Sequence, residues 1–226
     1  SAMLLLIPAV VKAEAVESIR EGLRDASYRD GRETARGAAA EVKHNEQLTP
    51  SAELAKKLGQ LVVDALYANA DLRAAAEPQR ILMPMFSRYR AGMSYGQHLD
   101  APILGQSPSQ LRTDLSVTVF LSDADAYEGG ELLLHVHGGT RAIKGKAGDV
   151  FIYPSDTVHE VREVTSGERL VAVSWIQSMV RDPAKRQILY DFTTGLNALE
   201  REGIAASETL RLRRCLYGLK RMWCEP

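Results

Sequence analysis

Residues 148–154 read Gly-Asp-Val-Phe-Ile-Tyr-Pro and form the clearest strand pattern in this sequence. The apolar run that follows Gly148 and Asp149 has the length and composition of a buried strand, and Pro154 stops it. A short turn then leads to His159. The stretch therefore predicts a buried strand that delivers His159 to a loop at its end.

A second strand is predicted from Arg169 to Ile176, and it carries a charge on an apolar face. Because side chains alternate along a strand, one face collects Arg169, Val171, Val173 and Trp175. A guanidinium on an inward face needs an anion, and its planar fork suits a carboxylate. Two partners remain open: an internal salt bridge to Asp149 or Glu168, or a dicarboxylate co-substrate.

The triplet His98-Leu99-Asp100 follows a third predicted strand, residues 81–90, and a glycine-punctuated turn, residues 91–96. On a strand, residues two apart point the same way and lie roughly 6.5 Å apart, so His98 and Asp100 can converge on one ion. With His159 they give two imidazoles and one carboxylate, a set that leaves three coordination positions open and favours Fe(II) or Mn(II). These three residues are the predicted metal ligands and the centre of the catalytic site.

These strands belong to a β-rich middle, from about residue 80 to residue 177, with helical patterns on both sides. Further strands are predicted over 114–121, 131–137 and 140–144, with a turn at Gly138-Gly139. Six or more antiparallel strands with metal ligands at their ends fit a double-stranded β-helix, or jelly roll. We therefore predict a mainly β fold with flanking helices.

The N-terminal part combines one strand with two helices. Residues 4–11 are predicted to be a buried first strand, and apolar side chains recur at helical spacing over 13–25 and 51–70. Residues 29–46 are charged and weakly patterned, so we predict a loop that borders the site. All of this falls within one predicted domain, residues 3–180.

Residues 181–226 are predicted to be a helical appendage, with a break at Gly203. Its basic residues between Arg211 and Arg221 alternate with leucines that would form the buried side of a helix, which favours a solvated face over an RNA site. Its apolar surface is consistent with packing on the barrel or with a homodimer.

Composition is that of an ordinary globular protein. The 226 residues are 45% hydrophobic and 25% charged, and the formal net charge of -1 gives no overall attraction to nucleic acid or to an anionic membrane. The sequence has no apolar run of 18 residues, which is the length expected of a helix that spans a bilayer. Cys215 and Cys224 are too few for a disulfide framework, which suits the cytoplasm.

The residues quoted so far, with several neighbours, resemble the Fe(II)/2-oxoglutarate-dependent oxygenases. The likeness is to the PKHD-type hydroxylases, relatives of prolyl 4-hydroxylase that are also called PiuC-like iron-uptake factors. It covers the whole chain, and its specific motifs are Arg88-Tyr89, Gly92 to Asp100, Arg112 to Ser116, Glu128 to Leu132 and His159 through Arg169.

The resemblance implies a jelly-roll dioxygenase that hydroxylates a C–H bond and releases succinate and CO2. It implies His98, Asp100 and His159 as iron ligands, Arg169 as the partner of the far 2-oxoglutarate carboxylate, and Tyr89 and Trp175 as further co-substrate residues. Prolyl 4-hydroxylases carry lysine where Arg169 stands, so the substrate need not be a peptidyl proline. Fe(II), 2-oxoglutarate, O2 and L-ascorbate are the implied cofactors, and the link to iron uptake suggests a siderophore-related small molecule or a peptide-like side chain as substrate.

Three polar residues, Tyr95, Gln97 and Arg112, are candidates to line the substrate opening, although each also fits a structural role at a strand end. Two other functions stay open. His135 and His137 share one strand face and, with His159, would give the three-histidine site of a cupin-like metal enzyme, although no glutamate follows at the cupin spacing. In the second alternative, the chain is a non-catalytic sensor that binds iron or 2-oxoglutarate.

Overall fold

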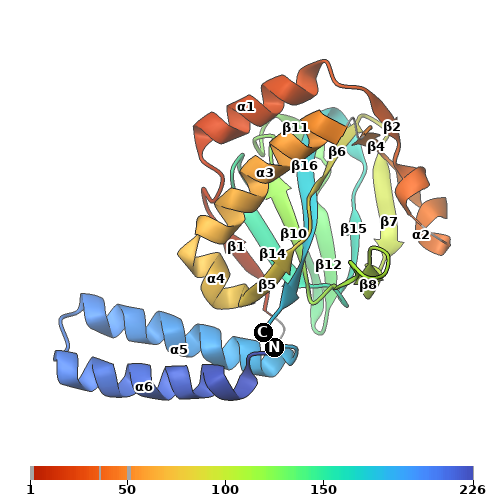
Figure 1. Ribbon diagram of the computed structural model, residues 1–226. Helices are drawn as coiled ribbons and strands as arrows, with labels where there is room; N and C mark the ends of the chain where they lie inside the picture. Colours follow the sequence, from red (N-terminus) through yellow and green to blue (C-terminus); the bar gives the residue numbers. More distant parts are fainter. Residues whose placement is uncertain (1–2, 36, 50–51, 226) are drawn as a thin grey trace.

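Two antiparallel sheets face each other at the centre of the fold, in a computed structural model that describes residues 3–35, 37–49 and 52–225 (Figure 1). The larger sheet runs, in spatial order, β1 (Leu5–Ile7), β14 (Val150–Pro154), β10 (Leu115–Phe120), β16 (Val164–Ser178), β6 (Met85–Arg90), β4 (Glu46–Leu48) and β2 (Tyr28–Asp30), and β11 (Tyr127–Gly129) and β5 (Pro78–Ile81) also pair with β16. The smaller sheet runs β13 (Gly139–Ile143), β12 (Leu132–Val136), β15 (Val158–Val161), β7 (Ser94–His98) and β3 (Lys43–His44). A further pair joins β8 (Ile103–Leu104) to β9 (Leu111–Arg112). The predicted jelly roll is confirmed.

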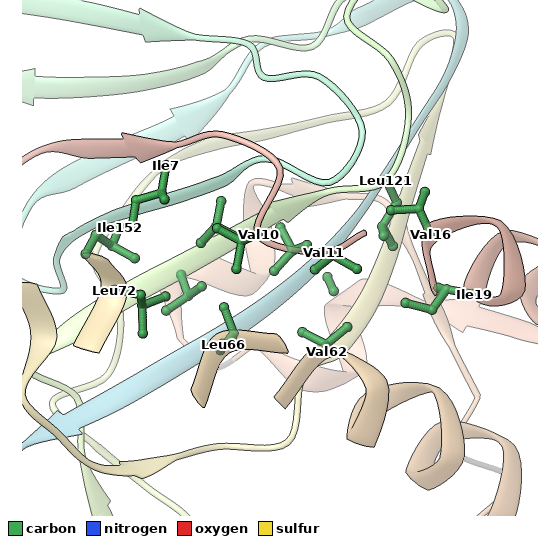
Figure 2. Packing of buried hydrophobic residues seen from close by; sticks show 14 of the residues in the cluster. Ile7, Val10, Val11, Val16, Ile19, Val62, Leu66, Leu72, Leu121 and Ile152 are labelled. Atoms are coloured by element: carbon green, nitrogen blue, oxygen red, sulfur yellow. The ribbon is translucent and has the colours of Figure 1, made fainter. Parts of the chain in front are cut away.

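Three helices cover the outer face of the larger sheet: α1 (Ala13–Arg24), α3 (Ala52–Ala68) and α4 (Ala70–Ala76) (Figure 1). Figure 2 shows how their apolar stripes meet the sheet, with Ile19 and Val62 from the helices packed near Leu121 and Val11. Burying an aliphatic side chain of this size contributes about 1.5–3 kcal/mol. This layer therefore holds the larger sheet firmly from outside.

The central strands of the larger sheet are buried on both faces, and the two faces differ in chemistry. Along β10, Leu115, Val117 and Val119 join the core under the helices, whereas Ser116, Thr118 and Phe120 alternate with them. Phe120 belongs to a second core, which lies between the two sheets and includes Tyr89, Leu134, Tyr153 and Val171. The polar side chains of the inward face are therefore the ones available to a site inside the barrel.

Several predicted elements have different limits in the structure. The predicted first strand is only three residues long, with Val10 and Val11 buried in the turn after it. The predicted strand over 81–90 is divided into β5 and β6, and the helix predicted over 51–70 is α3 followed by α4, with Ser51 outside the described residues.

The prediction of a loop over residues 29–46 was wrong. The segment holds the end of β2, then η1 (Gly31–Thr34), α2 (Ala38–Glu41), β3 and the start of β4. Its strands are too short for any pattern to show, and they form only because they pair with β7 and β6. One segment thus joins the edges of both sheets.

The C-terminal helices α5 (Pro183–Arg201) and α6 (Ala206–Trp223) pack against each other as a hairpin (Figure 1). Asp182 caps α5 by accepting hydrogen bonds from the backbone N–H groups of residues 184 and 185, and Gly203 lies in the turn. The hairpin is tied to the barrel by the Lys220 ammonium, 2.5 Å from the buried Glu77 carboxylate. None of the described helices is long and apolar enough to cross a membrane.

Candidate metal centre

Three side chains converge between the sheets at one end of the barrel. His98 and His159 face each other as cross-strand partners on β7 and β15, and Asp100 follows directly after β7. One ligand atom from each of the three lies within 4.8 Å of the others, which is the size of a site for one ion. The loop predicted to carry His159 is in fact the start of β15, so both histidines sit on paired strands.

Both imidazoles are held in the tautomer that a metal requires. The Nδ1 atom of His98 lies 2.8 Å from the carbonyl oxygen of Gly96, and that of His159 lies 2.9 Å from the carbonyl of Thr157. Nδ1–H therefore donates in each ring, which leaves the Nε2 lone pair free. Burial, helped by the neighbouring His159, lowers the pKa of His98 to about 4, so this ring is a neutral donor at pH 7.

Asp100 is oriented by two buried serines that the sequence did not single out. The Ser116 hydroxyl donates to Asp100 Oδ2 at 2.5 Å, and Ser155 Oγ lies 2.8 Å from Ser116 Oγ. Tyr153 adds a wall, because its ring packs edge-on against His159 with the ring centroids 5.2 Å apart. These contacts fix the carboxylate and one imidazole before any ion arrives.

Arg169 lies deeper in the barrel and is only 2% exposed. Neither predicted salt-bridge partner holds it: Asp149 accepts hydrogen bonds from the backbone N–H groups of residues 9 and 146, and Glu168 pairs with Arg90. Its Nε has no hydrogen-bond partner among the described residues, and its Cζ lies 5.0 Å from the ring centroid of Tyr89. A buried guanidinium with an unused donor fits the far carboxylate of a dicarboxylic acid.

Tyr127, on β11, is a neighbour of Arg169 that sequence reasoning missed. Its buried hydroxyl has no hydrogen-bond partner in the described part of the chain. Burial raises the pKa of Tyr127, and the nearby Arg169 guanidinium opposes that shift. The Glu128-Gly129-Gly130 motif next to Tyr127 was the signal in the sequence that could have indicated this contact. Gly130 has φ +67°, and a Cβ there would lie 3.0 Å from the Tyr127 ring and 3.1 Å from Arg169 Cδ, so glycine lets the two side chains come close.

Trp175 and Tyr95 both lie near the metal ligands. Trp175 is opposite Ser116 in the pairing of β10 with β16, so it is at the Asp100 end of the site rather than beside Arg169. Its buried Nε1 lacks a partner among the described residues. The Tyr95 ring stacks on His98, with centroids 3.5 Å apart and planes 12° from parallel.

The other two candidates for the substrate opening lie elsewhere. Gln97 is exposed and precedes His98 on β7, where adjacent side chains point to opposite faces. The guanidinium of Arg112 is already occupied, since it donates to both oxygens of Asp114, at 2.8 and 2.9 Å, and to the carbonyl of Ser178. Arg112 thus has the structural role that its position at a strand end also allowed.

The cupin-like alternative was wrong. Leu134, which is fully buried, pairs with His159 across β12 and β15, so His135 on the next position points to the opposite face of the sheet. There its Nε2 lies 3.3 Å from the Glu160 carboxylate, and His137 is exposed. Within residues 3–35, 37–49 and 52–225, the only group of three metal-binding side chains is His98, Asp100 and His159.

Comparison with known proteins identifies the family of this chain. Residues 84–177 match the model of the 2OG-Fe(II) oxygenase superfamily. A PKHD-type hydroxylase of Stenotrophomonas maltophilia is 39% identical over 224 residues, which are 99% of this chain and 100% of that protein. The chain belongs to the PKHD-type hydroxylases. A second member, from Synechococcus elongatus, is 42% identical with the same coverage.

Solved structures support the fold of this PKHD-type hydroxylase. A Pseudomonas putida prolyl-4-hydroxylase superposes with a TM-score of 0.55 at 19% identity, covering 79% of this chain and 94% of that one. A non-heme alpha ketoglutarate dependent carbocyclase from nogalamycin biosynthesis gives 0.57 at 17% identity, covering 78% and 80%. Because one fold carries such different reactions, the neighbours establish the jelly roll and not the substrate. Family membership makes the protein a 2-oxoglutarate-dependent dioxygenase that uses Fe(II), 2-oxoglutarate and O2.

Proposed function

We propose that His98, Asp100 and His159 bind the Fe(II) of this hydroxylase, and that Arg169 binds the far carboxylate of 2-oxoglutarate. One observation carries the proposal: three ligand atoms lie within 4.8 Å of one another, with both histidine Nδ1 atoms tied to carbonyls. A facial set of this kind leaves coordination positions open for the co-substrate and O2. Open positions distinguish a catalytic site from a structural one.

When bound, Fe(II) supplies the redox chemistry that couples decarboxylation of 2-oxoglutarate to hydroxylation of a C–H bond. The protein's part is positioning. Ser116 keeps Asp100 turned toward the ion, and Arg169 fixes the far end of the co-substrate, with Tyr89 and the free hydroxyl of Tyr127 beside it. The rings of Tyr153 and Trp175 wall the site against water, and selectivity follows from where the substrate carbon is held.

The test is anaerobic titration of Fe(II) into protein with 2-oxoglutarate, followed by the weak visible charge-transfer band of the chelate. We expect the band in the wild type and its loss in His98→Ala and Asp100→Ala. His137→Ala is the matched control, because this exposed imidazole lies outside the site and its removal should leave the band unchanged. A band that survives in His98→Ala would refute the assignment.

Further proposals concern ascorbate, the substrate class and the location of the protein in the cell. By analogy with prolyl 4-hydroxylases, we propose that L-ascorbate sustains turnover, which predicts more succinate per enzyme before inactivation when it is present. The family's association with iron uptake supports a siderophore-related small molecule or a peptide-like side chain as substrate. Both cysteines are free thiols, which supports a cytoplasmic location.

We also propose a homodimer formed through the C-terminal hairpin. Large apolar side chains are exposed on it, namely Ile188, Leu199, Leu210, Tyr217 and Met222. Apolar surface gathered on one element is typical of an interface. Sedimentation velocity of the wild type and of Leu210→Ser with Met222→Ser tests this, and a wild type that sediments as a monomer would refute it.

A further inference from the structure

The segment that joins the two sheets turns buried polar side chains toward the barrel. Residues 43, 45 and 47 alternate with more exposed neighbours, and Lys43, Asn45 and Gln47 are 5%, 5% and 4% exposed. Gln47 is satisfied, because it accepts from the Thr34 hydroxyl and lies 3.3 Å from Ser87 Oγ. Both side-chain amide atoms of Asn45 lack partners within the described residues.

Lys43 is a buried ammonium that forms no ion pair within the described part of the chain. It donates one hydrogen bond, 3.0 Å long, to Thr34 Oγ1, and no carboxylate of the described residues lies within ion-pair distance of it. Fully buried lysines are rare unless they are paired, because removing the charge from water is costly. Two of its three N–H donors are therefore free for something that is not part of this chain.

The ammonium lies close to the candidate metal centre. Its Nζ is 5.0 Å from the ring centroid of Tyr95, and that ring stacks on the metal-ligand candidate His98. Burial lowers the pKa of Lys43 to about 8, and the carboxylates of Asp100 and Asp30 oppose the shift. Lys43 is thus charged at pH 7 and separated from the metal site by a single aromatic ring. Arg169, a second buried cation of the described barrel interior, is the one that we propose for the co-substrate.

We propose that the substrate of this hydroxylase carries a carboxylate, and that Lys43 binds it. The inference rests on the proposed function, because it places the substrate next to the iron ligands. One ammonium with two free donors matches a single negative charge, whereas a phosphate dianion would call for a second cation that the described residues do not supply. The carbon that is oxidised therefore belongs to an acid and lies close to its carboxylate.

The experiment uses N-acetyl-L-amino acids, each paired with its primary amide, so that the members of a pair differ by one charge. The compounds are titrated anaerobically into the Fe(II)–2-oxoglutarate enzyme, and binding is followed as a change in the charge-transfer band, with succinate release in air as a second readout. We expect at least one acid to bind about 10- to 100-fold more tightly than its amide, the effect of a charge-assisted hydrogen bond.

Three variants separate substrate binding from a structural role. Lys43→Met should remove the preference for the acid while the 2-oxoglutarate dependence of the band stays unchanged, and Lys43→Arg should restore part of it. Lys185→Met is the matched control, since that lysine also lies over an aromatic ring, 5.8 Å from the centroid of Trp223, but in the C-terminal hairpin.

Equal binding of acids and amides, a preference that survives in Lys43→Met, or no acid that perturbs the band would overturn the proposal. So would weaker 2-oxoglutarate binding in Lys43→Met, because the lysine would then be a co-substrate ligand. A wild-type protein without any chelate band would instead overturn the proposed function itself.

Discussion

Replacing Arg169 with methionine should weaken 2-oxoglutarate binding and, at the same time, stabilise the protein without ligand. Arg169 is 2% exposed, and among the described residues its Nε has no hydrogen-bond partner and no carboxylate pairs with it. The guanidinium therefore carries the cost of burial in the free enzyme and recovers it only when a carboxylate binds. Methionine keeps most of the volume and removes the charge.

The two effects have opposite signs and separate magnitudes. Loss of one partner of a buried, hydrogen-bonded charge pair costs about 2–5 kcal/mol of binding, or roughly 30- to 5,000-fold in Kd. Replacing an uncompensated buried ion with an apolar side chain of similar volume should increase the free energy of unfolding by up to about 4 kcal/mol. The variant should thus have a higher Tm alone and a smaller Tm increase on adding 2-oxoglutarate.

The assay combines thermal unfolding, with and without 2-oxoglutarate, and anaerobic titration of the chelate band. Arg186→Met is the control: this arginine is also buried, at 4% exposure, but donates to the carbonyl oxygens of Val180 and Arg181 at 2.7 and 2.9 Å. It should lose stability and keep its affinity for 2-oxoglutarate. An Arg169→Met protein that binds 2-oxoglutarate within about threefold of the wild type would refute the reasoning, since that is under 1 kcal/mol.

Three further changes test neighbouring residues. Ser116→Ala removes the hydroxyl that orients Asp100 and should weaken Fe(II) binding by about 10- to 100-fold in an anaerobic titration; unchanged affinity would contradict it. Gly130→Ala combines a strained φ of +67° with close contacts and should lose both stability and 2-oxoglutarate affinity, whereas Gly138→Ala, with φ +96° and open space, should lose stability alone. Lys43→Met should be more stable than the wild type at pH 7 by up to about 3 kcal/mol, because the folded pKa is about 8 and the unfolded one is near 10.5. That advantage should shrink as the pH rises from about 8 to 10.5, because the wild type gains stability over this range. If chemical denaturation gives the same difference in free energy of unfolding at every pH, the prediction is contradicted.

Local pattern predicted most of the secondary structure and the three candidate metal ligands, whose side chains do lie together in the structure. Alternation along a strand placed Arg169 and Trp175 on one face, because the direction of a side chain on a strand depends only on the position along that strand. His98 and Asp100 also lie together, but β7 ends at His98, so strand alternation does not account for the position of Asp100. The helices followed in the same way from their apolar spacing.

Register between strands was decided only by the tertiary structure. His135 and His159 looked equally able to meet, but the pairing of Leu134 with His159 turns His135 to the outer face. A shift of one residue would have reversed this, and no local signal specifies it.

Contacts between distant segments were likewise beyond the sequence. Ser116 reaches Asp100, Tyr127 lies by Arg169, and Lys43 lies over Tyr95. Each pair comes from elements that meet only when the two sheets close, and the short strands around Lys43 exist only because β7 and β6 offer them hydrogen bonds. The sequence alone therefore indicated the candidate residues for the metal and the co-substrate, whereas the packing of the sheets decided what surrounds them.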